Sequence, residues 1–367
     1  MKTILNCLII IIICLSFFSC ADNGSKKNKI ANEETIKVND GIRDKVIRFS
    51  FTKVNTPNRK RVWKNIELKL ELKFGGINDT ILQLPSRLKI DNKQNIYLED
   101  WSDCSVKKYD NSGNYVRKYG RKGSGPGEFG QLYDFDIIDN GEIAALDPNG
   151  KKFVIFTDNT SKDVKCAIMP LDISFVSSEK VAILQIMEPV SESPIQIINY
   201  KNNLNYRYQN FLDTTSFDDE NYGMLPFLIG KIHRYNHKLV YISSIMGYVI
   251  IYNENGKIGK VFKLINAKDE IGSKKRVGNM VKFPSKEQYL CEGSNIFGDD
   301  LYVLVDKTTK TSDKYYIDVY SLTQCKYKYS LLLEGKGYLY SVYVANNIIY
   351  LVKQNAGIEK YSYKISI

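Results

Sequence analysis

A strand-forming unit recurs six times between residues 95 and 361, and this repeat constrains the fold more than any other feature of the sequence. In each copy an apolar strand is followed by a polar gap and by a second strand that ends in an aromatic residue. Separations of 47, 44, 52, 68 and 41 residues between these aromatics are close to the roughly 40–50-residue period of propeller blades. Six copies of a four-stranded unit predict an all-β, six-bladed β-propeller. The six aromatic residues are Tyr109, Phe156, Tyr200, Tyr252, Tyr320 and Tyr361.

The two ends of the repeat region predict how the ring closes. Only six residues follow Tyr361, which is too few for a turn and a fourth strand. Residues 66–74 alternate apolar and charged side chains, as a half-buried strand does. We therefore expect a propeller over residues 41–367 whose last blade is closed by this N-terminal strand, which leaves no long open edge. The 68-residue separation predicts an insertion at about residues 267–293.

The N-terminus predicts export. Lys2 is followed by an apolar run over residues 4–18 that is short for a membrane span and ends at a small residue and Cys20. Residues 17–20 resemble a bacterial lipobox, so we expect a lipoprotein signal peptide over 1–19 and a flexible tether over 20–40 that starts at acylated Cys20. An ordinary signal peptide or an uncleaved anchor is the alternative. Ala21 favours the outer membrane, on its periplasmic or its surface side.

Residues 109–129, with the sequence YDNSGNYVRKYGRKGSGPGEF, resemble the NHL repeat, and residues 84–91 and 95–100 fit its opening strands. Together with the lipobox, the chain resembles the 6-bladed β-propeller lipoproteins of Gram-negative anaerobes. The resemblance is specific in the first repeat and fair in the second, and the later repeats keep only the hydrophobic pattern. It implies a propeller displayed on the cell envelope.

Charge and cysteine content set few limits on partners. The formal net charge is +11, and the lysines are scattered along strands and loops. Export argues against a nucleic-acid partner. One basic cluster in the insertion, Lys274, Lys275 and Arg276, is a candidate for binding an anionic ligand.

The cysteines of the propeller indicate no metal or redox motif, because no Cys-x-x-Cys is present. Disulfides and free thiols are both open for these four residues: Cys104, Cys166, Cys291 and Cys325.

The sequence offers little chemistry for catalysis. His233 and His237 are the two histidines, and they flank a predicted strand turn, where they cannot bind one metal together. We expect no metal, no cofactor and no catalytic residue. Asp100, Asp147 and Asp306 occupy equivalent places at strand ends. They are candidate ligands for a calcium-assisted hydrolase or lactonase, or acceptors of turn hydrogen bonds.

The remaining interpretation is binding. Trp101 follows Asp100 in a predicted loop, where it can stack on a ligand or cover the adjacent blade. We expect a monomeric, membrane-anchored binding or scaffold protein that engages a protein, peptide or glycan through its loops. The calcium-assisted hydrolase or lactonase is the alternative function.

Overall fold

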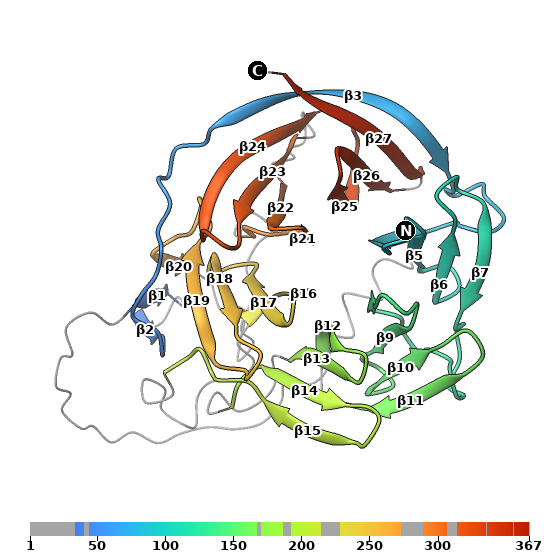
Figure 1. Ribbon diagram of the computed structural model, residues 1–367, viewed down its shortest axis with the longest axis horizontal. Helices are drawn as coiled ribbons and strands as arrows, with labels where there is room; N and C mark the ends of the chain where they lie inside the picture. Colours follow the sequence, from blue (N-terminus) through green and yellow to red (C-terminus); the bar gives the residue numbers. More distant parts are fainter. Residues whose placement is uncertain are drawn as a thin grey trace.

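The computed structural model describes residues 34–39, 44–166, 170–185, 192–213, 228–272, 289–306, 314–334, 336–354 and 356–366. The regular elements of these residues are β-strands, arranged as six blades around a central axis (Figure 1). No helix in this part of the chain is long and apolar enough to span a membrane. The prediction of an all-β, six-bladed propeller is confirmed.

The first four blades are antiparallel sheets of four consecutive strands, with the first strand innermost. Blade 1 contains β4 (Pro85–Ile90), β5 (Ile96–Asp100), β6 (Ser105–Tyr109) and β7 (Tyr115–Tyr119). Blade 2 contains β8 (Asp134–Ile137), β9 (Ile143–Asp147), β10 (Lys152–Phe156) and β11 (Ser161–Lys165). Blade 3 contains β12 (Pro170–Ser177), β13 (Lys180–Gln185), β14 (Ile195–Asn199) and β15 (Leu204–Arg207). Blade 4 contains β16 (Gly230–Tyr235), β17 (Lys238–Ser243), β18 (Tyr248–Tyr252) and β19 (Ile258–Lys263).

The last two blades share one strand from the N-terminal region, β3 (Trp63–Phe74). β3 pairs antiparallel with β27, from Phe74 opposite Ile358 to Asn65 opposite Ser366, and so supplies the fourth strand of blade 6. This confirms the predicted closure. β3 begins before residue 66, because Trp63 and Lys64 also pair in parallel with β24. Blade 5 contains β21 (Gly293–Phe297), β22 (Asp300–Asp306), β23 (Lys314–Ser321) and β24 (Lys326–Glu334), and blade 6 contains β25 (Leu339–Ala345), β26 (Ile348–Lys353) and β27 (Gly357–Ser366).

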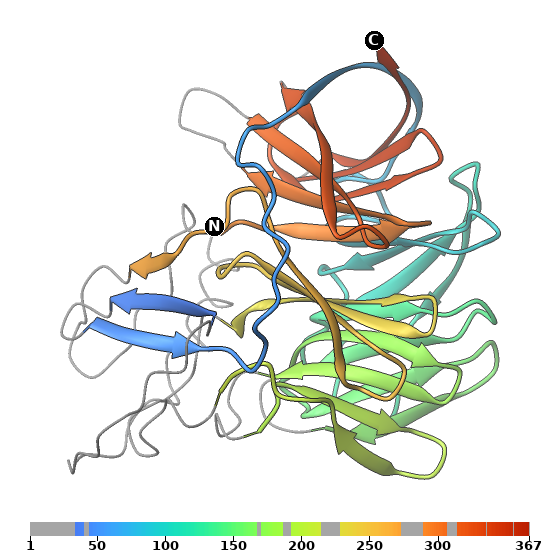
Figure 2. The same cartoon turned by 60° about the vertical axis from the view of Figure 1, so that its left-hand side comes forward.

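The described chain before β3, residues 34–39 and 44–62, forms an N-terminal arm along blades 4 and 5. β1 (Thr35–Asn39) pairs antiparallel with β2 (Asp44–Arg48) and in parallel with β20 (Glu270–Gly272), and these three strands project beside the ring in Figure 2. Further along, Asn55 forms a parallel bridge with Phe262 of β19. The residues predicted as tether, 20–40, thus include a strand at 35–39. β20 lies within the predicted insertion, whose residues 273–288 are outside the described part of the chain.

The hydrophobic core is divided among the seams between blades. The buried apolar residues of the described chain form six clusters, and each cluster joins two neighbouring blades. All six anchoring aromatics are buried in third strands or directly after one, as in Tyr200. Because every seam is filled, including that between blades 6 and 1, the ring is held without a single central core.

The two ends of the blades carry different connections. At one end, which we call the crossover face, each crossover between blades meets the turn between the second and third strands; the Trp101 N–H, for example, donates to the Leu84 carbonyl at 3.1 Å. Connections between blades are long here, such as residues 120–133 between β7 and β8. The opposite end, the turn face, carries short hairpin turns such as residues 298–299 and 346–347.

Candidate functional site

The central channel is lined by polar side chains from the innermost strands. Within these strands polar residues alternate with apolar ones, and the apolar residues, such as Phe135 and Ile232, are buried in the seams. The alternation follows from strand geometry, because successive side chains point to opposite faces. The polar residues that meet around the axis are Arg87, Lys89, Asp134, Asp136, Asp172, Ser174, Lys231, His233 and Ser294.

The half of the channel nearer the crossover face holds buried ion pairs. The Arg87 guanidinium lies 3.3 Å from Asp134 and 3.0 Å from Glu99, and the Lys231 ammonium lies 2.9 Å from Asp172. Burial, opposed by Lys231, raises the pKa of Asp172 to about 7. Burial alone would also raise the pKa of Asp134, but the charge of Arg87 brings it below its ordinary value. The two carboxyl groups hydrogen-bond to each other, so they share one proton near neutral pH.

The half of the channel nearer the turn face contains a cavity of about 170 Å³ to which the innermost strands of all six blades contribute. Lys89 Nζ lies 3.1 Å from Asp136 Oδ1, and the Ser174 hydroxyl donates to Asp136 Oδ2 at 3.0 Å. His233 Nε2 lies 2.8 Å from the Ser294 hydroxyl. Burial, reinforced by the charges of Lys89 and Lys231, lowers the pKa of His233 well below its ordinary value, so the imidazole is neutral. A neutral imidazole has one donor and one acceptor nitrogen.

Sequence analysis did not identify this channel. Its signal is the spacing of polar residues two apart in the first strand of successive blades, for example Arg87 with Lys89 and Asp134 with Asp136. In a single strand, a face that lines a channel and a face that is exposed to solvent have the same alternation of polar and apolar residues. Only the closure of the ring turns this face toward an interior.

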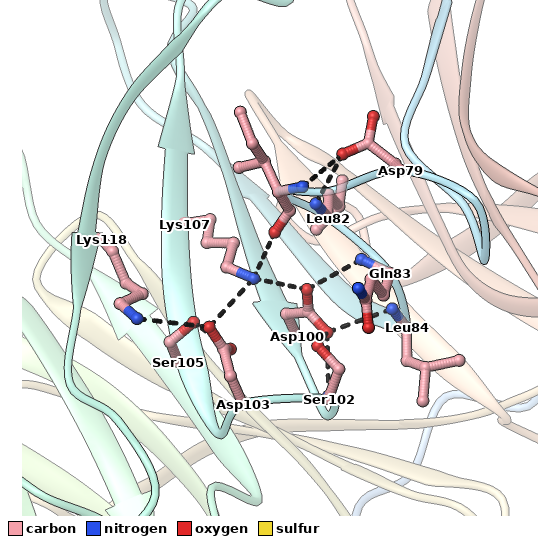
Figure 3. Close-up of polar contacts among 11 residues, drawn as sticks. Asp79, Leu82, Gln83, Leu84, Asp100, Ser102, Asp103, Ser105, Lys107 and Lys118 are labelled. Carbon is pink, nitrogen blue, oxygen red and sulfur yellow. Dashed lines mark hydrogen bonds and ion pairs between the residues drawn. The ribbon is translucent and has the colours of Figure 1, made fainter.

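Asp100 lies on the crossover face, where it fastens the incoming crossover to blade 1 (Figure 3). The buried carboxylate accepts hydrogen bonds from the backbone N–H groups of Gln83 at 3.0 Å and Leu84 at 3.1 Å. It also pairs with the ammonium of Lys107 at 2.6 Å. Lys107 in turn donates to the carbonyl of Ile81 in the same crossover.

Asp147 makes the equivalent contacts in blade 2. Its buried carboxylate accepts from the N–H groups of Gly130 at 2.8 Å, Gln131 at 3.1 Å and Gly150 at 2.9 Å. Asp306 ends β22 opposite Tyr315, and residues 307–313, which follow it, lie outside the described chain. The three aspartates thus belong to three separate blades and do not converge. Within the described ranges, no group of three or more His, Cys, Asp or Glu is arranged to hold a metal ion.

The other candidate residues fall in different places. Trp101 is exposed on the crossover face, and its ring lies 5.4 Å from that of Tyr340. His237 lies in the turn after β16, while His233 is inside the channel. The four cysteines of the propeller are free thiols. Cys20, Lys274, Lys275 and Arg276 lie outside the described residues.

Comparisons with known proteins agree with the architecture. A family model described as 6-bladed beta-propeller matches residues 77–184. A solved structure of a Bacteroides fragilis protein described as exported is similar over 86% of this chain and 99% of its own, with 12% identity and a TM-score of 0.57. A member of the duf4221 family from Bacteroides vulgatus is similar over 82% of this chain and 98% of its own, with 10% identity and a TM-score of 0.57. No curated protein matches the sequence. The chain is a six-bladed β-propeller, as the family model that matches residues 77–184 describes.

Proposed function

We propose that the chain is an exported binding protein that holds one sugar unit of a glycan in the channel cavity on the turn face. The observation that carries the proposal is the convergence of innermost strands from all six blades on one cavity. A concave site with a few convergent polar groups is the usual form of a ligand site. No catalytic role is assigned to these residues.

The chemistry of the lining favours a neutral, hydroxyl-rich ligand. Lys89 donates, Asp136 accepts, and Ser174, His233 and Ser294 can do both, which suits hydroxyl groups that donate and accept in turn. Cations and carboxylates are paired with one another, as in Lys89 with Asp136, so the channel has no strong excess of either charge. The cavity of about 170 Å³ is smaller than the roughly 300–1,000 Å³ of typical small-molecule pockets, and a single unit at the end of a chain suits it best.

Export and membrane anchoring are part of the proposal. They rest on the apolar run at residues 4–18, which ends at the lipobox-like residues 17–20. The similar Bacteroides fragilis protein is described as exported, which supports the same location for this chain. Acylation at Cys20 would attach the propeller to the outer membrane. Labelling with a fatty-acid analogue should be lost in Cys20→Ser, and labelling that persists would refute acylation at this residue.

The calcium-assisted hydrolase or lactonase receives less support from the channel. Asp134, Asp136 and Asp172 each have a cationic partner within 3.3 Å. A calcium ion needs six to eight oxygen ligands and would have to displace these cations. The channel therefore favours binding of a neutral ligand over binding of a divalent cation.

A glycan array followed by calorimetry tests the proposed ligand class. His233→Leu removes a hydrogen-bonding group from the cavity wall, and His237→Leu, four residues away in a turn, is the matched control. We expect about a five- to tenfold loss of glycan affinity in His233→Leu, the value of one hydrogen bond, and none in His237→Leu. Binding of peptides but not glycans, or equal affinity in both variants, would overturn the proposal.

A further inference from the structure

Four exposed apolar side chains gather on the crossover face around the junction of blades 6 and 1. They come from the crossover into blade 1, from the turn after β5, and from the crossover into blade 6. We call these four residues the crossover patch: Ile77, 58% exposed, Ile81, 41%, Trp101, 46%, and Tyr338, 44%. Exposed apolar side chains that lie together on one face are typical of a surface that contacts a membrane or a partner.

The crossover patch is rigidly supported. Trp101 lies against Tyr340, with ring centroids 5.4 Å apart, and Tyr340 lies against Tyr338 at 5.5 Å. The carboxylate of Asp79 accepts from the N–H of Ile81 at 2.7 Å, and Lys107 binds the Ile81 carbonyl. Ile81 therefore lies in a crossover that the buried Lys107–Asp100 pair holds in place, and Trp101 and Tyr338 are held by their ring contacts with Tyr340. Apolar groups held out in this way lose little conformational entropy on contact.

The N-terminal arm enters the fold on the same face. Glu34 accepts a hydrogen bond from the Tyr248 hydroxyl at 2.6 Å and pairs with Lys263 at 2.6 Å, and Lys263 ends β19 on the crossover face. Thirteen residues, 21–33, lie between Cys20 and Glu34. A link of this length spans at most about 50 Å. A membrane attached at Cys20 is therefore held close to the crossover face.

We propose that the crossover patch rests on the membrane surface, with Trp101 and Tyr338 at the level of the lipid headgroups and Ile77 and Ile81 just below them. Trp and Tyr favour this interface, and aliphatic side chains enter the acyl region beneath it. The inference rests on the proposed export and anchoring, but not on the proposed glycan site. In this orientation the turn face points away from the membrane, so the channel cavity is open to ligands in solution.

Intrinsic fluorescence tests the contact, because the chain has two tryptophans of almost equal exposure. Trp101 is 46% exposed and Trp63 is 47% exposed, but Trp63 begins β3, about 35 Å of strand before the crossover. The protein is the chain from residue 20 with Cys20→Ser, which carries no lipid. Trp63→Phe leaves Trp101 as the reporter, and Trp101→Phe leaves Trp63 as the matched control. The probe is a vesicle of phosphatidylethanolamine and phosphatidylglycerol, with or without brominated acyl chains.

We expect vesicles to shift Trp101 emission to the blue and brominated chains to quench it, while Trp63 emission stays unchanged. Adding Ile81→Ser to Trp63→Phe should lower vesicle partitioning about five- to tenfold, because less apolar surface enters the lipid. Unchanged Trp101 emission in a protein that is folded by circular dichroism would overturn the inference, as would equal quenching of both tryptophans. A Trp101 shift with soluble glycans but not with vesicles would assign the patch to a different ligand. Calorimetry on the same protein without vesicles tests the channel separately, so failure of one proposal leaves the other measurable.

Discussion

The ammonium of Lys107 lies 2.6 Å from the carboxylate of Asp100, and both side chains are buried. Through the same two groups blade 1 binds the backbone of Ile81, Gln83 and Leu84 in the crossover that follows β3. Because β3 closes blade 6, this pair fastens the first blade to the last at the point where the ring joins.

Replacing Asp100 by Ala should destabilise the fold strongly. The substitution leaves the backbone N–H groups of Gln83 and Leu84 without their acceptor. It also removes the nearer of the two carboxylates that pair with the buried Lys107 ammonium, and Asp103 at 3.2 Å is the one that remains. Together these losses cost about 2–5 kcal/mol. Chemical denaturation measures the loss in the free energy of unfolding. Asp110→Ala, which removes a carboxylate from an exposed hairpin turn, is the matched control and should cost clearly less. Equal losses in the two variants would contradict the role of the pair.

If the buried pair itself is responsible, an apolar replacement should restore stability. Asp100→Asn combined with Lys107→Met keeps an acceptor for the crossover backbone and removes the buried charge. We expect the double variant to unfold at a higher denaturant concentration than Asp100→Ala, because replacing both members of a buried ion pair costs less than removing one. A double variant that is no more stable than Asp100→Ala would argue against this account.

Two arginines of the N-terminal arm should differ in their effect on stability. Arg61 forms two hydrogen bonds to Asp318, of 3.0 and 2.8 Å, and its side chain is 15% exposed. Arg59 pairs with Asp269 at 3.0 Å with a side chain that is 61% exposed. Arg61→Ala should cost about 2–4 kcal/mol, since it leaves a buried carboxylate unpaired, and Arg59→Ala at most about 0.5 kcal/mol. Thermal unfolding of the two variants tests this difference. Similar decreases in the unfolding temperature would mean that Arg61 does not hold the arm against blade 5.

The shared proton of Asp134 and Asp172 predicts a pH effect. The pKa of Asp172 rises from its ordinary 3.8 to about 7, so between these values the folded state keeps a proton that the unfolded chain releases. The contribution of Asp172 to the free energy of unfolding is greatest below about pH 4, and it is lost as the pH rises to about 7. Asp172→Asn removes this dependence and keeps an acceptor for the N–H of Ile232.

The measurement is the difference in unfolding free energy between wild type and Asp172→Asn, taken from pH 4 to pH 8. The difference cancels the titration of groups that both proteins share, such as His233, whose lowered pKa acts in the opposite direction. The charged groups that act on Asp172 are Lys231, Asp134 and Lys89. We expect the unfolding free energy of Asp172→Asn, relative to that of wild type, to increase by a few kcal/mol as the pH rises from 4 to 8. A constant difference would show that no proton is shared.

The sequence predicts the ring well because the ring repeats. Tyr109, Phe156 and their equivalents fill the same place in each seam, so their spacing reveals the blades, and the alternating residues 66–74 reveal the closing strand. The N-terminal arm has no repeat, and its backbone pairings with the connection before blade 4 and with β19 are single bridges, Phe49 with Leu212 and Asn55 with Phe262. The channel is hidden for a different reason. A polar residue such as Lys89 or Asp136 looks solvent-exposed until the blades are placed in a circle.

The most direct test of the proposed ligand site is the proton NMR signal of the two histidines during titration with a glycan selected on the array. His233 lies in the cavity wall and His237 in a turn outside it, and a spectrum of His237→Gln assigns the two signals. We predict that the imidazole signal of His233 shifts in proportion to ligand bound while that of His237 stays in place. A His233 signal that does not move at saturating glycan would contradict binding in the channel.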